Sequence, residues 1–94
     1  MTDQLIITNE ADQSEFVAVL NGQRVGVLQY RRSDDVIDLQ HTIVEPAVGG
    51  RGVGSTLVKA ALDHACAEGL SVIPTCTFIP PYVAKHPEYQ DLLR

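Results

Sequence analysis

The chain has 94 residues, 45% of them hydrophobic and 20% charged, a composition typical of a globular protein with one modest core, so we expect one domain over residues 1–94. The formal net charge is -5, and no cluster of basic residues exceeds the pair Arg31 and Arg32, which argues against a nucleic-acid-binding protein. No apolar run approaches the roughly 20 residues that cross a bilayer, and the N-terminus does not resemble a signal peptide, so we expect a cytoplasmic protein without a membrane partner.

The first half of the chain predicts short strands. Apolar runs at residues 5–7, 16–20 and 25–30 predict three of them. Asn21 and Gly22 stand between the second and third runs, and this dipeptide tolerates the positive φ angles of a tight hairpin turn. The polar residues 33–35 predict a second turn, which leads to a longer strand.

This longer strand, residues 36–44, has two faces when its side chains alternate strictly. One face carries Ile37, Leu39, His41 and Ile43, and the other carries Val36, Asp38, Gln40, Thr42 and Val44. His41 therefore shares a face with three large aliphatic side chains. That position is typical of a hydrogen-bonded core histidine, although the ordinary pKa range of histidine also suits a general base.

The second half predicts one main helix over about residues 52–68, followed by Gly69 as a C-terminal cap. A strand follows at residues 70–73 and is interrupted by Pro74, and residues 80–94 predict one or two short helical turns. A strand–helix–strand crossover makes its two strands parallel. We therefore predict an α+β fold, with a mixed, mostly antiparallel sheet of about five strands. The apolar helix positions are Leu57, Val58, Ala61, Leu62 and Ala65, and the polar ones are Ser55, Lys59, Asp63 and Glu68.

Two cysteines and a C-terminal polar cluster add candidates for chemistry. The spacing of Cys66 and Cys76 makes no disulfide framework, so both cysteines are expected to be free thiols. Cys66 lies beside apolar helix positions and is interpreted as core. His86, Glu88 and Tyr89 are interpreted as residues that cap and dock the C-terminal segment. No set of His, Cys, Asp and Glu has the spacing of a metal site, so no metal is expected.

Four of the 7 glycines lie within residues 49–54, between the long strand and the helix. A glycine-rich turn that opens a helix exposes backbone N–H groups and favours a bound phosphate. The P-loop pattern fails because Ser55 stands where it requires lysine. The Rossmann pattern fails because the spacing is G-x-G-x-G and the preceding strands are antiparallel.

A third pattern fits this place in the chain. The sequence Gly52-Val53-Gly54 matches the last three positions of [QR]-x-x-G-x-[GA], the pyrophosphate loop of the GNAT acetyltransferases, while Gly49 replaces the usual Gln or Arg. The motifs H-T-x-V at residues 41–44, V-x-P-x-C at 72–76 and H-P-E-Y at 86–89 follow in order. Together they resemble a short, stand-alone subgroup of GNAT-like proteins, and the resemblance implies the minimal GNAT fold.

The resemblance also implies a function, an acetyl-CoA-dependent acyltransferase that acts on an amine. Coenzyme A would insert its pantetheine arm where the strands flanking the helix splay apart, at Pro74, and Cys76 would lie at the thioester as a candidate acetyl acceptor. His41 would be the base. The candidate coenzyme-binding residues are Ile43, Val44, Gly49, Gly50, Arg51, Gly52, Val53, Gly54 and Ser55.

Alternatives remain open at this point. Free cysteine is among the most buried residue types, so Cys76 is equally well read as a core residue. Glu45, at the end of the long strand, is a second candidate base. Full-length family members have two helices after the first strand, whereas only residues 8–15 separate the first two strands here. The acceptor site would then be shallow, open or completed by another molecule. The rival interpretation is a non-catalytic coenzyme A-binding or interaction module.

Overall fold

The computed structural model describes residues 4–48 and 52–94. Within these residues, five strands form one sheet in the order β1-β2-β3-β4-β5. The first four strands are consecutive antiparallel neighbours, and β5 pairs parallel to β4 after the helical crossover. The strands span Leu5–Glu10 (β1), Glu15–Leu20 (β2), Gln23–Ser33 (β3), Val36–Val44 (β4) and Ser71–Ile73 (β5).

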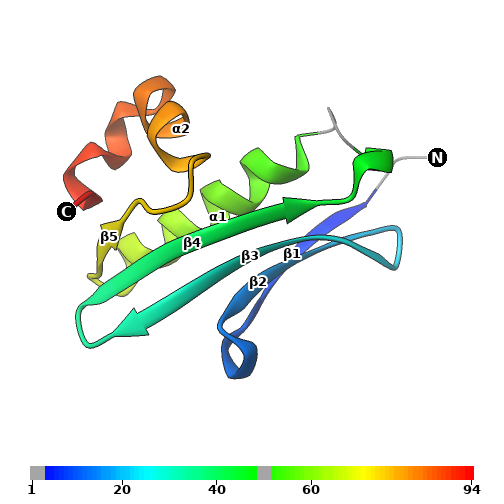
Figure 1. The fold of residues 1–94 in the computed structure, drawn as a ribbon, viewed down its shortest axis with the longest axis horizontal. Coiled ribbons are helices and arrows are strands. Elements are labelled where there is room, and N and C mark those ends of the chain that lie inside the picture. The colour runs from blue at the N-terminus through cyan, green and yellow to red at the C-terminus, as the bar shows by residue number, and fades with distance from the viewer. Residues whose placement is uncertain (1–3, 49–51) are drawn as a thin grey trace.

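The main helix, α1 (Val53–Ala67), lies across one face of this sheet, and a shorter helix, α2 (Ile79–Lys85), lies beyond β5 (Figure 1). Three 3-10 turns complete the described elements: η1 (Ala11–Gln13), η2 (Pro46–Val48) and η3 (Pro87–Leu92). This arrangement confirms the predicted α+β fold with its mixed sheet. No helix among the described residues is long and apolar enough to span a membrane.

The predicted local signals appear in the structure. Asn21 and Gly22 have φ angles of 52° and 84° and form the hairpin turn between β2 and β3. Gly69, with φ 66°, follows the end of α1 as a left-handed residue. The helix differs from its predicted bounds by one residue at each end, which is within the usual uncertainty of helix boundaries.

The core forms where α1 packs on the sheet. All five predicted apolar positions of α1 are buried there. Gly26 on β3 permits the close approach of the helix, because a Cβ atom at this position would lie 3.1 Å from Val53 Cγ1 and 3.2 Å from Leu57 Cδ1. The prediction for Cys66 is wrong, since its thiol is exposed. Cys66 lies seven residues after Lys59 and so falls on the polar stripe of the helix.

The face assignment along β4 is also wrong, because the strand contains a β-bulge. Gln29 pairs with His41 but Tyr30 pairs with Leu39, so Gln40 is the extra residue. The bulge reverses the alternation beyond it: Leu39 is fully buried, whereas His41 is exposed. His41 is therefore not a core histidine.

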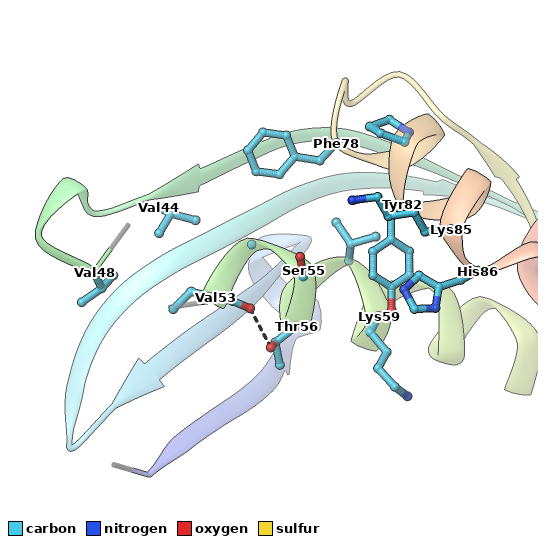
Figure 2. Close-up of a pocket in the computed structure, with 14 residues that line it drawn as sticks. Val44, Val48, Val53, Ser55, Thr56, Lys59, Phe78, Tyr82, Lys85 and His86 are labelled. Atoms are coloured by element: carbon cyan, nitrogen blue, oxygen red, sulfur yellow. Dashed lines mark hydrogen bonds between the residues drawn. The ribbon is translucent and has the colours of Figure 1, made fainter. Parts of the chain in front are cut away.

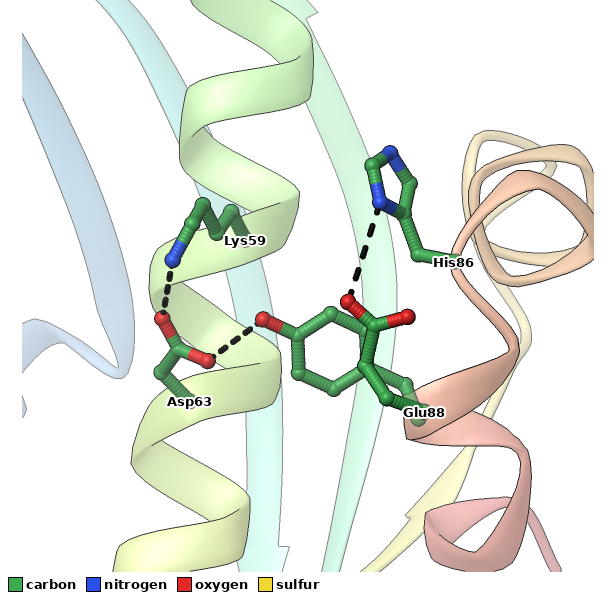
Figure 3. Close-up of polar contacts among 5 residues, drawn as sticks. Lys59, Asp63, His86 and Glu88 are labelled. Atoms are coloured by element: carbon green, nitrogen blue, oxygen red, sulfur yellow. Dashed lines mark hydrogen bonds and ion pairs between the residues drawn. The ribbon is translucent and has the colours of Figure 1, made fainter.

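The C-terminal segment is fastened to the outer side of α1 by a polar network (Figure 3). The Tyr89 hydroxyl donates a 2.6 Å hydrogen bond to Asp63 Oδ1, and Lys59 Nζ donates a 2.8 Å bond to Oδ2 of the same carboxylate. Burial opposes ionisation of Asp63, yet these two hydrogen bonds hold its pKa below the ordinary value. The hydrogen bond to Asp63 raises the pKa of Tyr89 to about 12. The predicted docking role of Tyr89 is confirmed.

Candidate functional site

A groove of about 680 Å³ lies between the start of α1, the end of β4 and the helix α2. Figure 2 shows Val44 and Phe78 on one side of it, Ser55 and Thr56 on α1, and Tyr82 on α2. Three segments that are far apart in sequence therefore meet here. The groove contains the start of the main helix, at the position where the glycine-rich loop leads into it.

The N-terminus of α1 is open toward this groove. Gly52 has φ 76° in the left-handed region, and no side chain among the described residues caps the helix or places a carboxylate in its first turn. The backbone N–H and the hydroxyl of Thr56 both donate hydrogen bonds to the Gly52 carbonyl oxygen, at 3.0 Å and 2.8 Å. By helix geometry, the N–H groups of Val53, Gly54 and Ser55 have no intrahelical acceptor. These donors and the helix dipole favour an anion.

Glycine at position 54 lets an aromatic ring lie against this first turn. A Cβ atom there would be only 3.0 Å from Phe78 Cε2. Phe78 is 46% exposed, and it lines both the groove and a second, smaller cleft of about 330 Å³. The ring therefore stands at the boundary between the two spaces.

Basic and aromatic side chains line the far end of the groove. Lys59 lies on α1, while Lys85 and His86 lie at the end of α2 (Figure 2). The rings of Tyr82 and His86 stack with their centroids 4.2 Å apart. The hydrogen bond to Asp63 raises the pKa of Lys59, so this ammonium group is cationic at neutral pH. Asp63 lies 2.8 Å from Lys59 Nζ and Glu88 lies 3.9 Å from His86 Nδ1, so carboxylates offset part of the positive charge at this end of the groove.

The strands β4 and β5 separate next to the groove. Their parallel ladder covers only Val36–Asp38 on β4, and Pro74 follows the last residue of β5. The backbone N–H of Cys76 donates to the Leu39 carbonyl at 2.7 Å, after which the two chains diverge. Thr75, the next residue whose N–H would face β4, donates to the Ile73 carbonyl at 3.0 Å instead, which ends the regular ladder at this point. Cys76 lies beyond β5 rather than on the strand.

The smaller cleft lies at this separation and is lined by both predicted catalytic residues, His41 and Cys76. Cys76 is buried, with only 5% of its surface exposed, and its Sγ atom lies 3.1 Å from Thr42 Oγ1. Asp38 supports the rim of the cleft, because its carboxylate accepts a 2.5 Å hydrogen bond from the Thr75 hydroxyl and a longer one from Gln40 Nε2 at 3.4 Å.

The other predicted site residues lie as follows. Residues 52–55 and Val44 line the groove, while Ile43 lines the smaller cleft and is 57% exposed. Gly49, Gly50 and Arg51 lie outside the described residues. Glu45 is exposed and lines neither space. In the described parts of the chain, no group of three His, Cys, Asp or Glu side chains could hold a metal ion.

Among the residues that line these spaces, sequence reasoning assigned no site role to several, including Thr42, Phe78, Tyr82 and Lys85. Thr42 belongs to the H-T-x-V motif, so the motif itself contained the signal. The strict alternation assigned it to the face opposite Ile37 and Leu39. The roles of Phe78, Tyr82 and Lys85 depend on where α2 packs, which no local pattern indicates.

Comparisons with known proteins agree with the geometry. The family model described as GCN5-related N-acetyl-transferase matches residues 15–92. Protein NATD1 of Mus musculus is 37% identical over 90 residues, which is 94% of this chain and 82% of that protein. Protein NATD1 of Danio rerio is 33% identical and covers 100% of this chain and 87% of its own length.

A solved structure is also similar. The solution structure of a GCN5-like protein from Staphylococcus aureus superposes with a TM-score of 0.71 and 30% identity, over 96% of this chain and 88% of that one. The match extends over the sheet, α1 and the C-terminal segment. The chain therefore belongs to the GCN5-related N-acetyltransferase family.

Proposed function

We propose that this protein is an acetyl-CoA-dependent N-acetyltransferase whose acceptor is an amine. The observation that carries the proposal is the meeting of the groove and the cysteine cleft at Phe78. The groove offers N–H donors without intrahelical acceptors, and lysine side chains, for phosphates, and the cleft contains a thiol and an imidazole. A long, thin substrate with phosphates at one end and a thioester at the other fits this sequence of chemical groups.

The phosphate end of coenzyme A would bind at the start of α1. The N–H groups of residues 52–55 would hold the pyrophosphate, together with residues 49–51. Lys85 lies at the other end of the groove and would attract the remaining phosphate, while Lys59 stays paired with Asp63. The stacked pair of Tyr82 and His86 offers an aromatic surface at the same end.

The pantetheine arm would lie along the part of β4 that is not paired with β5. Beyond Asp38 the described part of β5 has no ladder pairs with β4, so the backbone of Val44 is available on that side. The Glu45 N–H bonds the Val25 carbonyl, and by the alternation of the ladder the backbone of Ile43 also faces β3. An extended arm can add to such a strand edge by main-chain hydrogen bonds. This would direct the thioester toward Cys76.

Acetyl transfer through Cys76 would proceed in two balanced steps. The Cys76 thiolate attacks the thioester carbonyl, an S–C bond forms to Cys76, and the bond to the sulfur of coenzyme A breaks, leaving a thiolate that takes up a proton. The amine then attacks the acetyl group on Cys76, and the Cys76 thiolate leaves. His41 is exposed at the cleft and would accept the proton that the amine loses.

Coenzyme A binding is tested by calorimetric titration of two matched glycine variants. Gly52 and Gly69 stand at opposite ends of α1, both have positive φ, and at neither position would an added Cβ lie within 4 Å of a non-neighbouring atom of the described residues. Each change to alanine introduces a similar backbone strain of about 1–2 kcal/mol. We expect G52A to weaken binding at least tenfold and G69A to leave it unchanged. Equal affinities for the two variants, or no binding by the unmodified protein, would contradict the proposed site.

Acyl transfer is tested by intact-mass measurement after incubation with acetyl-CoA. We expect one added acetyl group, present in Cys66→Ser and absent in Cys76→Ser. Transfer to an amine panel that survives in Cys76→Ser but is lost in a His41 variant would instead indicate direct transfer. The net charge of -5 favours a basic acceptor, so the panel includes polyamines and lysine peptides.

A second candidate function is a non-catalytic coenzyme A-binding module. The short connection between β1 and β2 favours it, because the 3-10 turn Ala11–Gln13 replaces the helix pair expected for an acceptor cleft. Coenzyme A binding without acyl transfer to Cys76 or to any amine in the panel would support this alternative.

A further inference from the structure

We propose that the Thr42 hydroxyl donates a hydrogen bond to the Cys76 sulfur and stabilises its thiolate. Thr42 would then act directly on the reacting sulfur. Thr42 Oγ1 and Cys76 Sγ lie 3.1 Å apart, within hydrogen-bond distance for sulfur. The inference rests on the proposed role of Cys76 as nucleophile. It adds a residue to which we assigned no role from the sequence.

The direction of this hydrogen bond follows from the charge on the sulfur. In the neutral thiol, either atom can be the donor. A thiolate has no proton, so it can only accept, and the hydroxyl must then donate. Hydrogen bonds to an ionised partner are stronger than those to a neutral one, so this contact favours the charged form of Cys76.

Burial makes a donor from the protein necessary. Cys76 is only 5% exposed, which leaves little access for water to solvate a thiolate. Its own backbone N–H is already used in the 2.7 Å bond to the Leu39 carbonyl. Among the described residues that line the cleft, the titratable ones are Cys76 and His41. Asp38 adjoins the cleft, because its carboxylate accepts a hydrogen bond from Thr75, which lines it. No titratable side chain of α1 or α2 is among these lining residues.

The β-bulge at Gln40 explains how Thr42 reaches this position. Because Gln40 is the extra residue, Thr42 lies on the same side of the sheet as Leu39, where Cys76 lies. The same bulge makes His41 exposed. A single irregularity thus decides which of two consecutive side chains faces the sulfur and which faces solvent.

The experiment titrates the Cys76 thiolate by its ultraviolet absorbance in a Cys66→Ser background, with the Cys66→Ser/Cys76→Ser protein subtracted as a blank. Thr42→Val keeps the shape of the side chain and removes the hydroxyl, whereas Thr42→Ser keeps the hydroxyl. We expect Thr42→Val to move the titration midpoint up by about one pH unit, a roughly tenfold change in ionisation, and Thr42→Ser to leave it in place. Thr42→Ala, which also lacks the hydroxyl, should match Thr42→Val and replaces it should the valine variant not fold.

Alkylation by iodoacetamide supplies a signature that a loss of packing would not give. A thiolate that forms at higher pH is intrinsically more nucleophilic, with a Brønsted coefficient of about 0.4–0.5. Thr42→Val should therefore react about threefold more slowly at neutral pH and about threefold faster at high pH, so the two rate profiles cross. A uniform change at every pH, or a midpoint that does not move in Thr42→Val, would overturn the inference. The titration contains no acetyl-CoA, so its outcome is independent of whether Cys76 is acetylated.

Discussion

Replacing Tyr89 by phenylalanine tests the contact that fastens the C-terminal segment to α1, and with it the position of one wall of the groove. The change removes the hydroxyl that donates at 2.6 Å to Asp63 and keeps the buried ring. Hydrogen bonds to charged groups contribute about 1.5–3 kcal/mol. The Asp63 side chain is 49% exposed and keeps its 2.8 Å bond to Lys59, so water can replace the lost donor. We therefore expect a loss of about 1.5 kcal/mol, or roughly 6–12 °C in Tm.

The pH dependence of this loss follows from the pKa of Tyr89. Its folded-state pKa of about 12 lies above the ordinary value of 10.0, so its contribution is complete below pH 10 and declines as the pH rises toward 12. At about pH 10.5, roughly 0.8 kcal/mol of the difference between the two proteins should be lost, because tyrosine ionises first in the unfolded chain.

The assay is urea unfolding at about pH 7 and about pH 10.5 for the unmodified protein, Tyr89→Phe and Tyr82→Phe. Tyr82 is the matched control, since its hydroxyl has no hydrogen-bond partner among the described residues, and its replacement should change stability by less than about 0.5 kcal/mol. Equal losses for the two variants at neutral pH, or a Tyr89→Phe effect that grows between the two pH values, would refute the reasoning.

Three further outcomes are expected. Gly26→Ala places a methyl group against α1 and should lower the unfolding free energy by about 1–3 kcal/mol in urea; an unchanged midpoint would contradict the close packing. Thr75→Val removes the hydrogen bond that the Thr75 hydroxyl donates to Asp38. It should lower the unfolding free energy by about 1 kcal/mol and slow acetylation of Cys76, and an unchanged acetylation rate measured by mass spectrometry would contradict this expectation. A bulky thiol reagent, whose access depends on exposure, should modify Cys66 well before Cys76, and peptide mapping that finds the reverse order with this reagent would contradict their exposures.

Local signals in the sequence predicted most of the fold correctly. The Asn21–Gly22 turn, the amphipathic helix and the crossover to a parallel strand depend on backbone preferences and apolar spacing within a few residues. The order of separated motifs also indicated the family, and the interruption of the last strand at Pro74 was predicted, although the bond from the Thr75 N–H to the Ile73 carbonyl that ends its ladder was not. For these features, neighbouring residues alone determine the structure.

The geometry around the candidate site depends on tertiary structure instead. A periodicity argument assumes that a strand keeps its register, and the bulge at Gln40 exists only through the pairing of β4 with β3. That bulge decides that His41 is exposed and that Thr42 reaches Cys76, a residue 34 positions away in the chain. The sequence by itself therefore determined which elements form and which residues could carry chemistry. Only the packed structure decided which of them meet, because cross-strand pairing and helix docking join residues that no local pattern connects.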